Sequence, residues 1–220
     1  MLWYVKLSIL LSQELTVSAS STIVQEIGAM QESGLASLAF YYHDFREDGK
    51  KDRRGLLLSV LSQLCDQSDS YHDIISMFYS RHDDGKRSPS NNELLQCFKS
   101  LLELPEQAPV YLIIDALDEC PNTSAIPSPR EELLALVEQL VESRLTNLRL
   151  CVTSRPEMDI KTVLEPLTFR SISIHNERGQ MEDIENYIRS VVNGDPKNRR
   201  WKREDKELVI KVLIERADGM

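Results

Sequence analysis

Residues 110–120, VYLIIDALDEC, constrain the fold more than any other stretch of this chain. Five apolar residues, Val110–Ile114, run without interruption into Asp115, and two more acids, Asp118 and Glu119, follow within four positions. Continuous apolar runs are typical of strands buried on both faces, as in parallel sheets. Acids crowded at one strand end repel each other unless a cation, hydrogen bonds or water offset their charge. The stretch therefore predicts a central parallel strand that ends in a polar site.

Further strands are predicted at residues 35–42, 148–152 and 169–174, each of which is short and mainly apolar. The segments between them carry apolar residues at helical spacing, and from about residue 176 the pattern is helical only. Strands that alternate with helices indicate βαβ units. We therefore expect an α/β fold with a doubly wound parallel sheet, followed by helices.

Polar residues follow two of the predicted strands. Asp115, Asp118 and Glu119 come after one strand, and Thr153–Arg155 come after the next, with a single helix between them. In open α/β sheets, ligands bind beyond the carboxyl ends of the strands. A magnesium–phosphate site needs a carboxylate for the metal, another to orient water and an arginine for phosphate oxygens. The two strands, if adjacent, would bring this mixture to one edge.

Three stretches, in order, resemble parts of NACHT-type NTPases, which belong to the STAND class of signalling P-loop ATPases. VYLIIDALDEC resembles their Walker B strand, with a small residue, Ala116, right after the metal aspartate. LRLCVTSRPE resembles their sensor strand, whose arginine is Arg155 here. Residues 38–65 resemble the aromatic strand, charged loop and helix between Walker A and Walker B. The likeness covers roughly residues 20–220 and is to fungal NACHT proteins with a nephrocystin-type NTPase domain, often followed by ankyrin or other repeats.

The resemblance implies a three-layer, P-loop-NTPase-like parallel sheet, incomplete in this chain. It divides the sequence into an atypical leader in place of the P-loop region (1–19), an NTPase core (20–175) and the beginning of a truncated helical subdomain (176–220). It also implies a cytoplasmic protein that binds ATP or GTP with Mg²⁺, hydrolyses it slowly and self-associates under nucleotide control. Effector and repeat domains are the partners expected in a full-length protein.

The resemblance also assigns roles to individual residues. By matching position, Asp115 would bind the cofactor and hold the Mg²⁺ shell. Asp118 or Glu119 would orient the attacking water, and Arg155 would sense the γ-phosphate. The simpler interpretations are a solvated strand-end turn with a helix cap for the three acids, and a surface salt bridge for Arg155.

The phosphate-binding pattern G-x-x-x-x-G-K-[ST] does not occur in the sequence. In that pattern the backbone N–H groups cradle phosphates, the lysine reaches the β and γ oxygens, and the hydroxyl binds Mg²⁺. Gly49–Lys50 and Gly85–Lys86 lack both the upstream glycine and the following hydroxyl residue. Residues 1–19 stand where the first strand and the loop belong. We therefore expect poor nucleotide binding, in a truncated or misassembled gene product or a degenerate paralogue.

The first twenty residues loosely resemble a signal peptide, with a short apolar run and small residues near Ala19. Lys6 interrupts that run, however, and Gln13 and Glu14 follow it. An apolar span of 18 residues, the length needed for a membrane helix, does not occur. We therefore expect an amphipathic or poorly ordered leader and no membrane partner.

The bulk composition argues against a general nucleic-acid binder, because the net charge is −9 and such proteins need clustered Lys and Arg. The basic cluster at residues 196–204, around Trp201, is interpreted as a solvated loop between helices. The four cysteines show no C-x-x-C pair, which favours reduced, mostly buried thiols in an intracellular protein.

Two classes of function remain open. One is a nucleotide-dependent signalling switch, and the other is a scaffold or interaction remnant that keeps the fold without nucleotide chemistry. A metal-dependent nuclease is weaker, because no lysine follows the acids near residue 115 at a suitable spacing on a strand. The apolar face of the helix at 204–217 has little chain left to cover it, so we expect that end to be frayed, docked or used in association.

Overall fold

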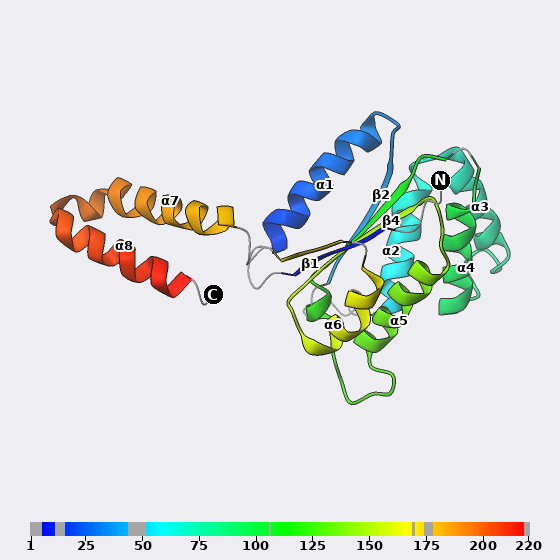
Figure 1. Ribbon diagram of the computed structural model, residues 1–220. Coiled ribbons are helices and arrows are strands. Elements are labelled where there is room, and N and C mark those ends of the chain that lie inside the picture. The colour runs from blue at the N-terminus through cyan, green and yellow to red at the C-terminus, as the bar shows by residue number, and fades with distance from the viewer. Residues whose placement is uncertain are drawn as a thin grey trace. The chain divides into compact units, whose positions relative to one another are not determined.

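The computed structural model describes the backbone of residues 6–11, 16–43, 52–105, 107–168, 170–173 and 178–217. The chain divides into two compact units, residues 1–172 and 173–220. As far as the fifth strand the elements are β1 (Lys6–Leu11), α1 (Thr16–Glu32), β2 (Ser37–Tyr42), α2 (Arg53–Cys65), α3 (Asp69–Ser80), α4 (Asn91–Leu102), β3 (Val110–Asp115), the 3-10 turn η2 (Leu117–Glu119), α5 (Pro129–Glu142), β4 (Leu148–Ser154), α6 (Met158–Leu164), η3 (Glu165–Leu167) and β5 (Arg170–Ser173) (Figure 1). The elements that follow are α7 (Arg178–Gly194), η5 (Pro196–Arg200) and α8 (Arg203–Ala217).

The five strands form one sheet in the order β2-β3-β4-β1-β5. β2 pairs with β3, β3 with β4, and β4 with β1, and all three pairs are parallel. The prediction that the strands at 110–114 and 148–152 are parallel neighbours, with the strand at 35–42 in the same sheet, is confirmed. Their carboxyl ends meet at one edge, because Tyr42 lies opposite Asp115 and Leu11 lies opposite Ser154.

β1 is the main difference from the sequence-based expectation. Residues 1–19 were expected to be an amphipathic or poorly ordered leader, whereas Lys6–Leu11 form a strand between β4 and β5. The physical reason is the edge of β4, whose N–H and C=O groups need partners on both sides. The stretch Lys6–Leu11, which is apolar at four of its six positions, can satisfy them as a strand as readily as it can form part of a helix. Residues 12–15, in the region where the phosphate loop of the related NTPases belongs, lie outside the described residues. Residues 44–51, which are part of the expected charged loop, do so as well.

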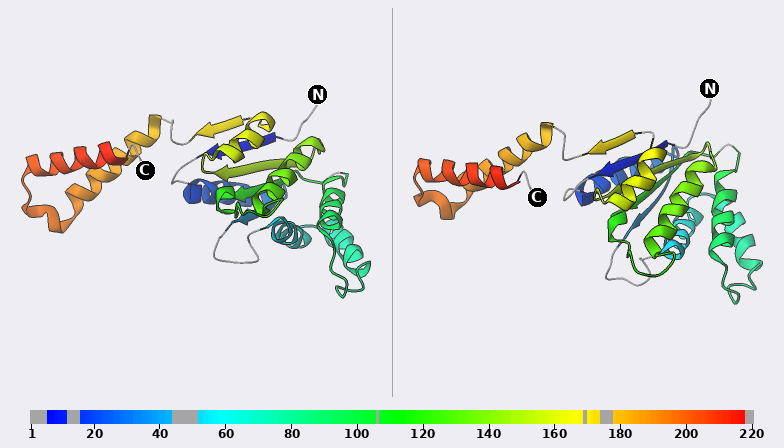
Figure 2. Two further views of the ribbon diagram at one scale, coloured as in Figure 1. Left: turned by 90° about the horizontal axis from the view of Figure 1, so that it is seen from below. Right: turned by 60° about the horizontal axis from the view of Figure 1, so that its bottom comes forward.

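The helices cover both faces of the sheet, so the fold has the predicted three layers. Figures 1 and 2 show α1 on one side of the strands and α2, α5 and α6 on the other. Right-handed crossovers explain this division. The step from β1 to β2 runs along the sheet in one direction, whereas the steps from β2 to β3 and from β3 to β4 run in the opposite direction. Crossover connections of the same hand that run in opposite directions along the sheet lie on opposite faces of that sheet.

The core lies between β2–β4 and the helices α2, α4 and α5. β3 contributes Val110, Leu112 and Ile114, all of which are fully buried, as the uninterrupted apolar run predicts. Ser90 and Ser128 are the N-caps of α4 and α5, and each forms a capping box with a glutamate three residues on. α3 was not expected from the sequence.

The second unit is a helical hairpin. α7 and α8 bury Val192 and Ile210, and Arg189 on α7 forms an ion pair with Glu207 on α8. On the face of α8 that was expected to be apolar, Leu208, Val212 and Leu213 are exposed and Val209 is half-buried. Within the described part of the chain, no helix combines the length and the hydropathy that crossing a membrane requires.

Candidate functional site

A buried carboxylate lies at the centre of the carboxyl edge of the sheet. Asp115, the last residue of β3, is 3% exposed. Its Oδ1 accepts hydrogen bonds from the hydroxyls of Ser20 on α1 and Thr153 on β4, both of which are fully buried. A carboxylate removed from water needs such donors to stay charged. Three elements that are distant in sequence therefore converge on one acid.

Ala116 turns the chain away from the sheet directly after Asp115. Its φ is 53°, in the left-handed region that residues with a side chain rarely adopt. The amide of Ala116 donates to the hydroxyl of Thr153 at 3.0 Å, which holds this turn against β4. The turn buries Leu117 in the core and leaves Asp118 and Glu119 at the edge of the sheet. A small residue fits here because a larger side chain adds strain in this conformation.

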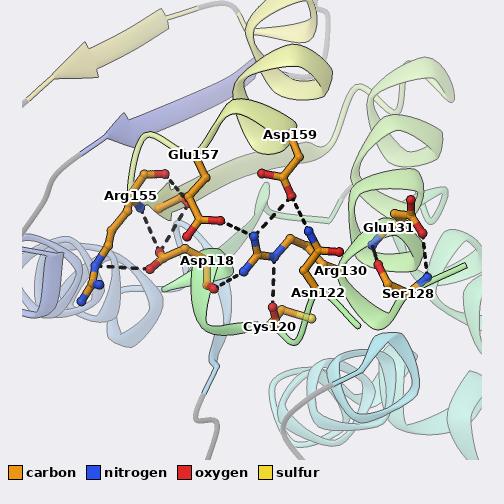
Figure 3. A network of polar contacts seen from close by, with 10 residues as sticks. Asp118, Cys120, Asn122, Ser128, Arg130, Glu131, Arg155, Glu157 and Asp159 are labelled. Atoms are coloured by element: carbon orange, nitrogen blue, oxygen red, sulfur yellow. Dashed lines mark hydrogen bonds and ion pairs between the residues drawn. The ribbon is translucent and has the colours of Figure 1, made fainter. Parts of the chain in front are cut away.

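Asp118 and Arg155, both predicted site residues, are joined directly. Oδ1 of Asp118 accepts from the backbone amide of Arg155 at 2.9 Å, and Oδ2 lies 3.4 Å from Nε of the Arg155 guanidinium (Figure 3). The hydroxyl of Ser154 also points to Oδ1, at 3.4 Å. The Asp118 side chain is 7% exposed and that of Arg155 is 61% exposed. The carboxylate is therefore committed to the end of β4, while the guanidinium extends into solvent.

Glu119, the third predicted acid, is the last residue of η2 and is half-buried. Its amide donates to the carbonyl of Ala116 at 2.9 Å, which closes the 3-10 turn. The structure thus brings all four predicted residues to one edge of the sheet. Asp115 is held by hydroxyls below the surface, Asp118 is paired with Arg155 closer to solvent, and Glu119 lies on the 3-10 turn beside them.

A fifth charged residue, Arg130, supports this edge and was not anticipated. It lies on the first turn of α5 and is 7% exposed. Its guanidinium donates to the carbonyls of Asp118 and Cys120, and to the carboxylates of Glu157 and Asp159 (Figure 3). The turn after β3 and the segment after β4 are therefore tied together by one side chain.

The electrostatic field around Asp115 is negative. Burial, followed by the Asp115 carboxylate, raises the pKa of Tyr42, the residue opposite it on β2. The same two causes, in the same order, raise the pKa of the Cys151 thiol on β4 to about 11. A nearby cation would be favoured by this field. The Ser20 hydroxyl and the Asp115 carboxylate supply hard oxygen ligands, and this pair fits Mg²⁺ bound together with nucleotide phosphates.

The roles of three residues of this site, Ser20, Thr153 and Arg130, were not predicted from the sequence. Ser20 carries a weaker signal, because it is the fifth residue of α1, one turn beyond the helix start at which phosphate-binding loops place their metal-binding hydroxyl. Thr153 was identified as a polar strand end, but not as a partner of Asp115. Arg130 has no local signal, because its four acceptors come from residues 118–120 and 157–159.

Solved structures with a similar fold include proteins of the origin recognition complex. The Aeropyrum pernix ORC2 protein, solved in ADPNP–ADP complexes, matches with a TM-score of 0.51 at 12% identity, over 94% of this chain and 50% of that one. Drosophila ORC bound to AT-rich DNA and Cdc6 matches with a TM-score of 0.42 at 13% identity, over 97% of this chain and 75% of that one. This chain therefore spans about half of the Aeropyrum pernix protein. The first likeness agrees with the predicted α/β, P-loop-NTPase-like fold class.

No curated protein matches the sequence significantly. One family model does match, that of the nephrocystin 3 N-terminal domain, over residues 16–155. This match covers more than half of the 220 residues and ends at Arg155, so it includes Ser20, Asp115, Asp118 and Arg130. The chain belongs to the nephrocystin 3 N-terminal family.

Proposed function

We propose that this chain is a nucleotide-binding signalling module of the NACHT and STAND type, which takes ATP or GTP with Mg²⁺. The observation that carries the proposal is the hydrogen bond between Ser20 and Asp115. It joins the second turn of the helix after β1 to the end of β3, and these lie close to the two places from which P-loop NTPases supply their metal-binding hydroxyl and aspartate. A solvated strand-end turn does not require a buried acid with two hydroxyl partners.

The contacts divide the chemical roles among the acids. Ser20 and Asp115 would hold Mg²⁺, which neutralises charge on the β and γ oxygens when it is bound. Asp118 is engaged with the amide and Nε of Arg155, and this favours Glu119 as the residue that orients water. In this proposal the exposed guanidinium of Arg155 would contact the γ-phosphate.

Binding by this sequence is expected to be weak, because it lacks the glycine-rich loop and its lysine. That loop supplies charge-assisted hydrogen bonds worth about 1.5–3 kcal/mol each. Loss of three of them costs about 5–9 kcal/mol, which corresponds to about a thousandfold or more in affinity. The proposed partners are nucleotide, a second copy of the chain, and effector or repeat domains of a longer protein. Nucleic acid and membrane are not among them, and the proposed location is the cytoplasm.

The second candidate is a scaffold of the same fold that has lost nucleotide chemistry. It is favoured by the pairing of Asp118 with Arg155, because the two groups satisfy each other without a ligand. It is also favoured by the absence of the phosphate-loop pattern from the sequence.

Calorimetric titration of the purified chain with Mg·ATP and Mg·GTP separates the two candidates. The module predicts binding in the millimolar range that requires Mg²⁺ and is lost in Asp115→Asn. Asp73→Asn, which removes an exposed acid from α3, is the control for charge and should bind as the wild type does. Failure to bind at any attainable nucleotide concentration would favour the scaffold. Low-micromolar binding that Asp115→Asn abolishes would contradict the expected impairment.

A further inference from the structure

Arg130 reaches both segments that carry the predicted site residues, without contacting Arg155 itself. Nε donates to the carbonyl of Cys120 at 3.0 Å and Nη2 donates to the carbonyl of Asp118. Nη1 donates to Glu157 and, at 3.2 Å, to Asp159. Figure 3 shows this guanidinium between the turn after β3 and the segment after β4.

These contacts form a closed ring. Arg130 holds the main chain of Asp118, and the Asp118 carboxylate holds the amide and Nε of Arg155. The carbonyl of Arg155 accepts from the amide of Glu157 at 2.8 Å, and the Glu157 carboxylate returns to Arg130. A shift of the turn after β3 or of the segment after β4 would therefore break a charge-assisted contact elsewhere in the ring.

The guanidinium suits this place better than another cation would. Burial opposes the charge of Arg130, but the hydrogen bonds and charges of Glu157 and Asp159 outweigh it, so its pKa is raised. The side chain is almost fully buried, whereas its two acidic partners are 43% and 40% exposed. A planar fork with fixed donors can serve two carbonyls and two carboxylates together, which the single ammonium of lysine cannot do.

We propose that Arg130 is a positioning residue that holds Asp118 and Arg155 in register at the edge of the sheet. Its effect on nucleotide rests on the function proposed above, in which Arg155 meets the γ-phosphate. Arg130 touches neither metal nor nucleotide in that scheme. Its role is to hold the turn at 117–119 and the segment at 155–159 at a constant separation.

Hydrogen exchange of the nucleotide-free protein tests the positioning role directly. In Arg130→Lys, peptides over 116–120 and 153–160 should exchange about tenfold faster or more, as expected when a charge-assisted hydrogen bond is lost. Peptides over β2 and α4 should exchange as in the wild type. Unchanged exchange at the Arg155 amide would overturn the proposal, and so would an equal increase throughout the chain, which would indicate general destabilisation.

Two further variants complete this experiment. Arg54→Lys is the matched control, because Arg54 also donates to a main-chain carbonyl, that of Pro89, but away from the strand ends. It should leave exchange at 153–160 unchanged. Glu157→Gln removes one charge from an exposed partner of Arg130 and should speed up exchange over the same two segments by a smaller factor. If Arg130→Lys does not fold, the result for Glu157→Gln decides the proposal.

Nucleotide discrimination gives a second readout, which a general loss of stability would not produce. Arg130→Lys should lower the affinity for Mg·ATP more than that for Mg·ADP, because only the triphosphate presents a group to Arg155. An equal loss for both nucleotides would contradict the positioning of Arg155. If the wild type binds neither nucleotide, the proposed function fails, and the exchange experiment still decides whether Arg130 positions Asp118 and Arg155.

Discussion

The hydroxyl of Ser20 donates a hydrogen bond to the buried carboxylate of Asp115, although the two residues are 95 positions apart. The bond forms because β1 and β3 both flank β4 and all three strands are parallel, so that α1 starts beside the end of β3. Both oxygens are suitable ligands for a hard cation. The pair is therefore the most direct target for mutation.

Ser20→Ala should weaken the dependence of nucleotide binding on Mg²⁺ while leaving the fold intact. The physical reason is the loss of one of the two protein oxygens available to the metal. Titration with and without Mg²⁺ measures this dependence, and circular dichroism checks the fold. Ser33→Ala is the matched control, since Ser33 lies just beyond the other end of α1 and is exposed. Equal effects of the two substitutions would remove Ser20 from the proposed site.

Thr153→Val should lower the free energy of unfolding by about 1–3 kcal/mol. The hydroxyl of Thr153 serves both Ala116 and Asp115, so its loss leaves a partly buried amide and a buried carboxylate each short of one partner. Urea denaturation measures the change. Thr153→Ser keeps the hydroxyl and should retain most of the stability. If serine destabilises as much as valine, the methyl group of Thr153, rather than its hydroxyl, supports the turn.

Ala116→Gly should be neutral or stabilise the protein by up to about 1 kcal/mol. Glycine relieves the left-handed strain, worth about 1–2 kcal/mol, at an entropic cost of about 0.5–1 kcal/mol. Ala39→Gly, in the extended backbone of β2, is the control and should destabilise, because no strain is relieved there. Ala116→Val should also destabilise. Thermal and urea unfolding of the three variants give the sign of each change, and a loss of stability in Ala116→Gly would contradict strain at this turn.

Glu93→Gln should change how stability depends on pH in the acid range. The backbone amide of Ser90, then its hydroxyl, and the charge of Arg87 lower the pKa of Glu93 from 4.5 to about 2. A carboxyl whose pKa is lowered by folding contributes stability above pH 4.5, and this contribution is lost as the pH falls towards 2. The variant should therefore be less stable than the wild type at neutral pH, and the difference should shrink between those two values. A difference that stays constant over this range would contradict the pKa shift.

The sequence predicted the two strands that carry the candidate site because the information is local. An uninterrupted apolar run before Asp115 indicates burial on both faces. The adjacency of β3 and β4 was expected because a single helix separates them and consecutive parallel strands are usually neighbours. Local pattern and this short connection are therefore enough to bring the predicted acids and the arginine to one edge of the sheet.

β1 shows where local patterns stop being sufficient. The run at 6–11 is compatible with several conformations, and its pairing with β4 decides among them. α3 is a different case, because it has a clear apolar side, with Tyr71 fully buried and Ile74, Ile75 and Phe78 packed against the core. The local signal for this helix was therefore present in the sequence, although the helix was not predicted.

The fold class, the acids at the end of β3 and the arginine after β4 could thus be predicted from sequence, because burial and strand period are properties of neighbouring residues. The contacts by which Ser20 and Thr153 hold Asp115, and by which Arg130 joins Asp118 to Glu157, could not. Those contacts depend on the order of strands in the sheet and on the separation of its loops. Both result from packing the whole domain, and no window of a few residues contains them.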